Sequence, residues 1–233
     1  MKKLSDYLFY QDDWATIYCG DCLKIMPLME FESVDLIYAD PPFNVKHGMG
    51  VSAREYSGEA YNNLPDDEFK IFCDKWFSFA RKIGKRFLIT PGAKNIYKYP
   101  EPIQITIISQ PSKCSFNPFG GYNCWEPLLV YNKPVLKLPR DVVIFDSLNF
   151  GNPIEAKHPC PDNPGMVRWI IETWSNEKDT ILDPFLGSGT TCVAAKNLNR
   201  KSIGIEINPE YCSISVKRLR QEVFDFRKNP LDR

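Results

Sequence analysis

Residues 35–44, DLIYADPPFN, place a carboxylate, two prolines and an aromatic ring where an apolar run ends. Pro41 and Pro42 have no backbone N–H, and their rings fix φ, so the chain is stiff at this point. Asp40 and Phe43 stand on either side of them. Such a segment is either a simple turn at the end of a strand or a site that holds a ligand.

A second candidate site is the glycine loop in residues 181–198, ILDPFLGSGTTCVAAKNL. It has no lysine before its Ser/Thr pair, as a P-loop would, and it lacks the third glycine of the dinucleotide fingerprint. Glu206 follows Gly187 by 19 residues, at the end of the next apolar run. An acid at this spacing reaches ribose hydroxyls in nucleotide-binding folds. Gly187 and Gly189, with Asp183 at the strand tip, therefore predict a site for an adenosyl-type ligand.

Strands and helices are predicted to alternate along the chain, which indicates an α/β fold with a doubly wound, mostly parallel sheet. The run 34–39 is apolar at nearly every position, as a parallel strand buried on both faces should be. Strands are expected at 15–19, 34–39, 86–90, 103–109, 126–132, 141–145, 180–183 and 202–206, and helices at 22–29, 65–83, 165–175, 190–198 and 209–224.

The composition is that of an ordinary globular chain, and 233 residues fit a single domain, 1–233. The 29 basic and 29 acidic residues give zero net charge, so a nucleic-acid partner would require basic residues gathered on one face. No apolar segment reaches the length of a membrane span, and no signal peptide is expected.

The cysteines are predicted to be ordinary reduced thiols. Cys19 and Cys22 form a single CxxC pair, whereas a zinc site would need a second pair of ligands at suitable spacing. The only two histidines, His47 and His158, are far apart in the sequence. We therefore expect no metal site.

Several segments together resemble the amino-methylating DNA methyltransferases. ADPPFN (39–44) is similar to their catalytic Asp-Pro-Pro-Tyr/Phe motif, LDPFLGSGTT (182–191) to their S-adenosylmethionine loop, and GIEINPEY (204–211) to the segment after it. The catalytic motif comes before the cofactor motif, which resembles the circularly permuted beta group. The resemblance covers about residues 15–220 and implies a Rossmann-like methyltransferase fold.

The resemblance gives the catalytic residues Asp40, Pro41, Pro42 and Phe43 their expected roles. The target base must leave the helical stack to be reached. The Asp40 carboxylate and the Pro41 carbonyl would each accept one N–H of its exocyclic amine, Pro42 would help to hold the turn, and Phe43 would stack on the base.

The cofactor implied by the resemblance is S-adenosylmethionine. Near His158 the family pattern has a lysine that this chain lacks, because the sequence there reads KHPCPDNP. For Asp21, helix N-capping is the alternative role. The residues expected to bind the cofactor are Asp21, Cys22, Asp40, His158, Asp183, Phe185, Gly187, Ser188, Gly189, Thr190, Thr191, Glu206 and Ile207.

Double-stranded DNA is the expected partner. A short target-recognition insert is expected at about 134–157, too small for a separate domain, and predicts a short or relaxed recognition site. A flexible loop at about 44–63 either grips DNA or forms a solvated lid. Its candidate DNA contacts are Asn44, Lys46, His47 and Arg54.

Family members with Asp at the first motif position usually methylate adenine N6, so Asp40 favours adenine. Cytosine N4 methylation is the first alternative, and a non-catalytic methyltransferase-like DNA-binding subunit is another. An RNA or protein methyltransferase is a further alternative, of which the protein-glutamine methylases are disfavoured, because they carry Asn at this position and have the cofactor loop first. The resemblance also implies a cytoplasmic protein of bacterial, archaeal or phage origin, a homodimer, and a restriction endonuclease as partner.

Overall fold

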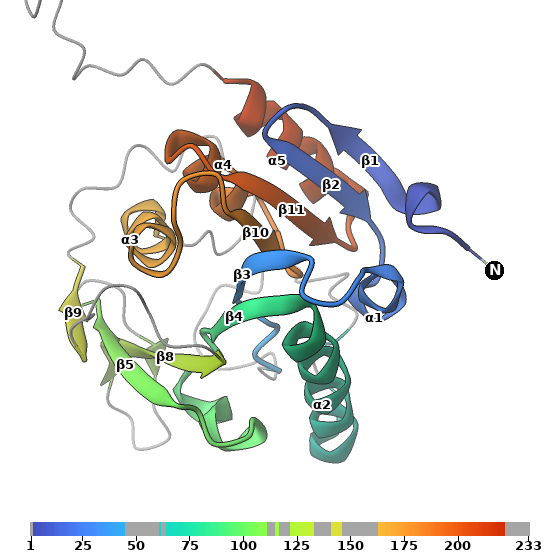
Figure 1. Cartoon of the computed structure of the whole chain (residues 1–233). Coiled ribbons are helices and arrows are strands. Elements are labelled where there is room, and N and C mark those ends of the chain that lie inside the picture. The colour runs from blue at the N-terminus through green and yellow to red at the C-terminus, as the bar shows by residue number, and fades with distance from the viewer. Residues whose placement is uncertain are drawn as a thin grey trace, which may run out of the picture.

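The computed structural model describes residues 2–44, 61, 64–110, 115–116, 122–132, 141–145 and 163–221. Within them, nine strands form one sheet in the order β1-β2-β11-β10-β3-β4-β8-β5-β9 (Figure 1). The predicted mostly parallel, doubly wound α/β fold is thereby confirmed.

The centre of the sheet consists of five neighbouring strands that all run in the same direction. The central strand β3 is buried at five of its six positions, which explains its nearly continuous apolar sequence. These strands are β2 (Ala15–Cys19), β11 (Lys201–Glu206), β10 (Thr180–Asp183), β3 (Val34–Ala39) and β4 (Gly84–Ile89).

Antiparallel strands extend the sheet on both sides of this centre. β1 (Leu8–Gln11) pairs with β2 and was not predicted, since its side chains are mostly exposed and give no clear apolar signal. On the other side, β8 (Trp125–Asn132) lies antiparallel between β4 and β5 (Gln104–Ser109), and β9 (Val142–Ile144) pairs with β5. Two short strands, β6 (Ser115–Phe116) and β7 (Tyr122–Asn123), form a separate pair.

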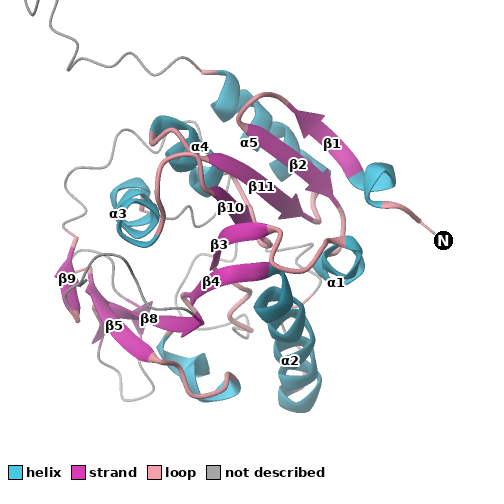
Figure 2. Ribbon diagram, viewed as in Figure 1, coloured by secondary structure: helices cyan, strands magenta, loops and turns pink. Residues whose placement is uncertain are grey.

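Helices cover both faces of the sheet (Figure 2). On one face, α1 (Cys22–Ile25), its 3-10 extension η2 (Met26–Leu28) and α2 (Asp66–Ile83) share a core with β3 and β4. On the opposite face lie α3 (Pro164–Trp174), α4 (Thr190–Asn197) and α5 (Pro209–Arg220). Two further 3-10 turns, η1 (Leu4–Tyr7) and η3 (Ala93–Lys98), precede β1 and follow β4. Among the described helices, none is long and apolar enough to cross a membrane.

An aromatic cluster fixes α2 against the sheet. The ring of Trp76 is fully buried and meets the rings of Phe87, Tyr99 and Phe185 at centroid distances of 5.7, 5.7 and 5.1 Å. These partners come from β4, from the residue after η3, and from the glycine loop. Trp76 therefore couples the glycine loop to the core that α2 and β4 share.

Element bounds agree with the prediction to within a few residues. The helix expected at 22–29 divides into α1 and η2, because Pro27 interrupts it, and α5 ends at Arg220 rather than 224. Most of the expected insert 134–157 lies outside the described residues, as do 45–60 and 62–63 of the loop and 222–224 of the last helix.

A buried arginine ties two helix ends together on the α3/α4 face. Arg200 is only 6% exposed, and its guanidinium donates to the Ser175 carbonyl at 2.9 Å, to the Ser175 hydroxyl at 3.0 Å and to the Leu198 carbonyl. Ser175 and Leu198 follow the last turns of α3 and α4, where a cation interacts favourably with the helix dipole. Burial lowers the pKa of this guanidinium.

We expect Arg200→Met to lower the free energy of unfolding by about 2–3 kcal/mol, because it leaves buried carbonyls without their charged donor. Arg81→Met, at an exposed position in the last turn of α2, should change it by less than about 0.5 kcal/mol. Denaturant unfolding of both variants provides the measurement. Equal stability of the two variants would show that the Arg200 contacts contribute nothing.

Candidate active site

Four predicted site residues are brought to one edge of the sheet. Glu206 and Asp183 end β11 and β10, while Asp21 and Asp40 follow β2 and β3 by two residues and one residue. Since these strands are parallel neighbours, their carboxyl ends meet at the same edge, which is where open α/β sheets bind ligands. The sheet therefore aligns the predicted cofactor residues with the predicted catalytic turn.

The Asp40 carboxylate is held by Thr90, the residue that follows the neighbouring strand β4. The Thr90 hydroxyl donates to Asp40 Oδ1 at 2.9 Å, and the Thr90 backbone N–H donates to the Ala39 carbonyl at 3.0 Å. The Tyr38 hydroxyl lies 3.3 Å from the same Thr90 oxygen. Thr90 is fully buried, so this contact orients a half-buried carboxylate from the protein side.

Asparagine side chains hold the rest of the catalytic turn. The Asn95 amide donates to the carbonyls of Phe43 at 3.0 Å and Pro91 at 3.1 Å. The amide of Asn44 donates to the Leu64 carbonyl at 2.9 Å and accepts from its N–H at 2.8 Å. Asn44, which was predicted to contact DNA, is 5% exposed and joins the two ends of the 45–63 loop.

The glycine loop depends on conformations that glycine favours. Gly187 and Gly189 have φ values of 52° and 85°. A Cβ at Gly189 would lie 2.8 Å from Cβ and Oγ of Ser215 on α5. The Glu206 carboxylate, 8% exposed, accepts from the N–H groups of Gly187 at 2.8 Å and Asn208 at 2.7 Å. The acid expected to reach the ribose thus also shapes the loop beside it.

A half-buried arginine supports the same loop from α5. Arg218 donates to the Ser188 carbonyl at 2.7 Å, the Ser188 hydroxyl at 2.8 Å and the Thr190 hydroxyl at 3.1 Å. Burial lowers the pKa of the guanidinium. Ser188, Thr190 and Thr191, all predicted to bind cofactor, are at most 6% exposed. Their backbone N–H groups, rather than these hydroxyls, are the better candidates for ligand contact at a helix N-terminus.

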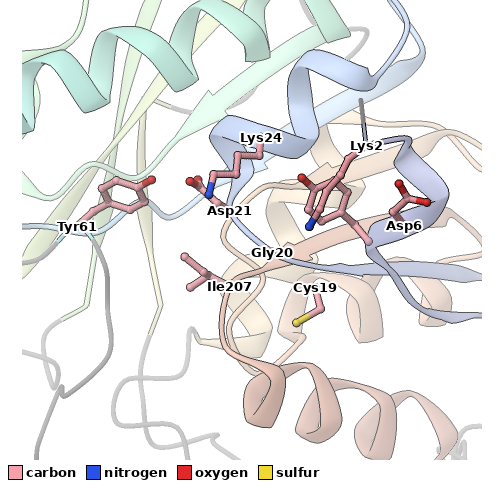
Figure 3. A pocket seen from close by; sticks show the side chains of 9 residues that line it. Lys2, Asp6, Cys19, Gly20, Asp21, Lys24, Tyr61 and Ile207 are labelled. Atoms are coloured by element: carbon pink, nitrogen blue, oxygen red, sulfur yellow. The ribbon is translucent and has the colours of Figure 1, made fainter.

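A cavity of about 580 Å³ opens beside these strand ends (Figure 3). Its volume falls within the usual range for small-molecule sites. Asp21 and Ile207, both predicted cofactor residues, line it, and the N-terminal segment closes its outer end. The other lining residues are Lys2, Asp6, Tyr7, Cys19, Gly20, Lys24 and Tyr61.

Tyr61 is a site residue that the sequence did not indicate. Its ring stacks on Phe72 of α2 at a centroid distance of 4.0 Å, and Phe72 meets Phe185 of the glycine loop edge-on at 6.1 Å. Burial, and then a hydrogen bond to the Asp21 carboxylate, raise the pKa of the Tyr61 hydroxyl. Tyr61 therefore links the 45–63 loop to the cavity.

The remaining predicted residues differ in position: some lie at the cavity or a strand end, one lies in the core, and others are outside the described residues. Asp21 caps α1 by accepting from the Leu23 N–H at 2.9 Å, so it serves as N-cap while also lining the cavity. Asp183 accepts from the Phe185 N–H at 2.9 Å. The Cys22 side chain packs in the core, where burial raises the pKa of its thiol, and does not line the described cavity. His158, Lys46, His47 and Arg54 lie outside the described residues.

The described cysteines are free thiols, and the described residues contain no group of three His, Cys, Asp or Glu side chains that could hold a metal ion. Thr90, Asn95, Ser215, Arg218 and Tyr61 were all missed by sequence reasoning. Only Thr90 had a usable signal, as a polar residue ending an apolar strand next to β3.

Comparison with known proteins agrees with this geometry. Residues 123–217 match the model of the DNA methylase family, N6/N4 type. The chain is 29% identical to "Type II methyltransferase M.HpaI" of Haemophilus parainfluenzae, over 90% of this chain and 76% of that protein. It is 27% identical to "DNA adenine methyltransferase YhdJ" of Escherichia coli, over 90% of this chain and 84% of that protein.

Solved structures share the fold. The PvuII cytosine-N4-specific DNA methyltransferase superposes with a TM-score of 0.71 at 18% identity, covering 91% of this chain and 89% of that one. The complex of M1.HpyAVI with SAM superposes with a TM-score of 0.63 at 24% identity, covering 89% and 100%. The fold is that of S-adenosylmethionine-dependent methyltransferases. The chain is similar to DNA methyltransferases of the amino-methylating N6/N4 type.

We expect Gly189→Ala to weaken S-adenosylmethionine binding by at least tenfold, because the new Cβ meets Ser215 and the left-handed φ strains alanine. Isothermal titration calorimetry measures the affinity. Gly165→Ala, in the first turn of α3 and without a positive φ, serves as the matched control. A folded Gly189→Ala protein with unchanged affinity would contradict the role assigned to this loop.

Proposed function

We propose that this protein methylates the N6 amino group of adenine in double-stranded DNA, acting on a base flipped out of the helix. The observation that supports the proposal is the Asp40 carboxylate, held by Thr90 at the edge where the cavity and the glycine loop also lie. Reaching an exocyclic amine inside a duplex requires base extrusion.

S-adenosylmethionine fits the site because the left-handed glycine turn brings backbone close, while Asp21, Glu206 and Ile207 stand at adjoining strand ends. When bound, it supplies a methyl group on a positively charged sulfur; transfer leaves a neutral thioether and releases one proton from the amine. Asp21 and Ile207 would hold the adenine end and Glu206 the ribose, with Asp183, Phe185, Gly187 and Gly189 shaping the middle.

The catalytic turn orients the amine rather than activating it by strong base chemistry. The Asp40 carboxylate and the Pro41 carbonyl each accept one N–H, which directs the lone pair toward the methyl donor. Pro41 and Pro42 add no N–H donors that would compete for the carboxylate. Phe43, supported by Gly92 and Asn95, provides a flat surface for the extruded base.

Adenine is favoured over cytosine because the first motif residue is Asp40 and one relative is named as an adenine methyltransferase. Cytosine N4 is the second candidate, since the PvuII cytosine-N4 enzyme shares the fold. The proposal also includes a single domain over 1–233 with a recognition insert at 134–157. It further includes a homodimer, a restriction endonuclease partner and a cytoplasmic location.

The first test is Asp40→Ala, which should reduce methyl transfer from labelled S-adenosylmethionine to DNA by about 100-fold or more. Cofactor affinity, measured by calorimetry, should change by less than about tenfold. Nucleoside mass spectrometry of the wild-type product should give N6-methyladenine. If Asp40→Ala labels DNA as well as wild type, the catalytic assignment fails; N4-methylcytosine would overturn the choice of base alone.

The second test concerns Thr90 as a positioning residue. Thr90→Val removes the donor to Asp40 at nearly constant volume, and kcat should fall about 10- to 100-fold. Thr90→Ser restores the hydroxyl and should recover most of the rate, while KM for S-adenosylmethionine stays near the wild-type value in both variants. Equal losses in the valine and serine variants would point to packing instead of the hydrogen bond.

A further inference from the structure

The 3-10 turn η3 (Ala93–Lys98) stands directly beside the catalytic turn. Gly92, at its start, has a φ of 71°, and a Cβ there would lie 3.4 Å from the Phe43 ring. Asn95 within the turn is 2% exposed and donates to the Phe43 carbonyl. The position of η3 is thus coupled to that of the ring proposed to hold the flipped base.

The inner side of η3 is anchored in the protein. Tyr99, which follows it, is 7% exposed and packs against Trp76 and Phe77 at ring distances of 5.7 and 6.0 Å. The carbonyl of Pro100 accepts from the Tyr131 hydroxyl at 2.8 Å. The turn is therefore a fixed platform and not a loosely attached loop.

The outer side of η3 presents a cation and an aromatic ring. Tyr97 is 92% exposed, and Lys94 is exposed as well. Side chains three residues apart in a 3-10 helix eclipse one another, so Lys94 and Tyr97 share one face. Lys94 comes one residue before Asn95 and Tyr97 comes two residues after it. At the rise of a 3-10 helix, both therefore lie within about 4 Å of Asn95 along the helix axis. Lys98, by contrast, pairs with Asp66 at 3.4 Å.

We infer that Lys94 and Tyr97 form a contact surface for duplex DNA next to the flipped base, with Lys94 on a backbone phosphate and Tyr97 against the neighbouring nucleotide. This rests on the proposed function, because it places the duplex at the Phe43 ring. The backbone of an extruded nucleotide stays joined to the duplex on both sides. Groups fixed beside the extruded base therefore lie near the flanking phosphates and sugars.

The charge and chemistry of this pair suit DNA. The chain has zero net charge, so phosphate contacts have to come from individually placed lysines and arginines such as Lys94. A planar ring such as Tyr97 can stack on a base or pack against a sugar without sequence preference. The pair would add affinity and hold the duplex while leaving recognition of the sequence to other residues.

The amino-terminal ends of β3 and β4 offer a matched control. Phe31 is 74% exposed and Lys82 is exposed, and the two lie close together because the Glu32 N–H donates to the Lys82 carbonyl at 2.9 Å. They precede β3 and β4, whereas Asp40 and η3 follow these strands. An exposed ring with a nearby lysine thus occurs at both ends of the same two strands.

The first experiment measures binding of the full chain, saturated with S-adenosylhomocysteine, to a fluorescent duplex at several salt concentrations. Lys94→Ala should weaken binding about 3- to 10-fold and make the slope of log K against log salt less negative by about 0.9, one phosphate contact. Lys82→Ala should leave both quantities unchanged. An unchanged slope for Lys94→Ala, or equal slopes for the two variants, would overturn the phosphate contact.

The second experiment measures KM for duplex DNA and kcat. Tyr97→Ala should raise KM about fivefold or more, Tyr97→Phe should keep it near wild type, and Phe31→Ala should not change it. Wild-type KM in Tyr97→Ala would overturn the ring contact. Wild-type protein that transfers no methyl group to DNA would defeat the proposed function itself. Impaired capture of a protein partner with normal DNA kinetics would reassign the surface to protein binding.

Discussion

The parallel register of β2, β11, β10, β3 and β4 is the constraint on which the rest of the structure depends. Strands that run in one direction must end at one edge, so residues distant in sequence meet there without any direct pairing between them. Asp40 and Glu206 are 166 positions apart, yet only β10 separates their strands. The order of motifs along the chain therefore matters less than the strand that each one follows.

Side chains at this edge also hold the backbone that surrounds them. Glu206 accepts hydrogen bonds from the N–H groups of Gly187 and Asn208. Arg218, on the face of the sheet opposite α1 and α2, donates to the carbonyl of Ser188 in the glycine loop. Thr90 and Asn95 do the same for the catalytic turn. Because Thr90, Asn95 and Glu206 are buried, little reorganisation is needed when a ligand arrives, which is how positioning lowers a barrier.

The sequence was sufficient for the central strands, since β2, β3 and β10 are short apolar runs with clear ends. It was also sufficient for the carboxylates at their tips. It was insufficient for Arg218, whose place on an amphipathic helix resembles that of any surface arginine, and for Tyr61, whose contacts with Phe72 and Asp21 depend on tertiary packing. Strand β1 was missed because edge strands bury too little to leave an apolar pattern.

The central claim is that the sheet edge directs one methyl donor toward Asp40. A crystal structure of the protein with S-adenosylmethionine tests it most directly. We expect the adenine ring in the cavity lined by Asp21 and Ile207, the ribose at Glu206, and the methyl group facing the Asp40 carboxylate across a space that fits a base amine. A cofactor bound elsewhere, or a methyl group turned away from Asp40, would contradict the account.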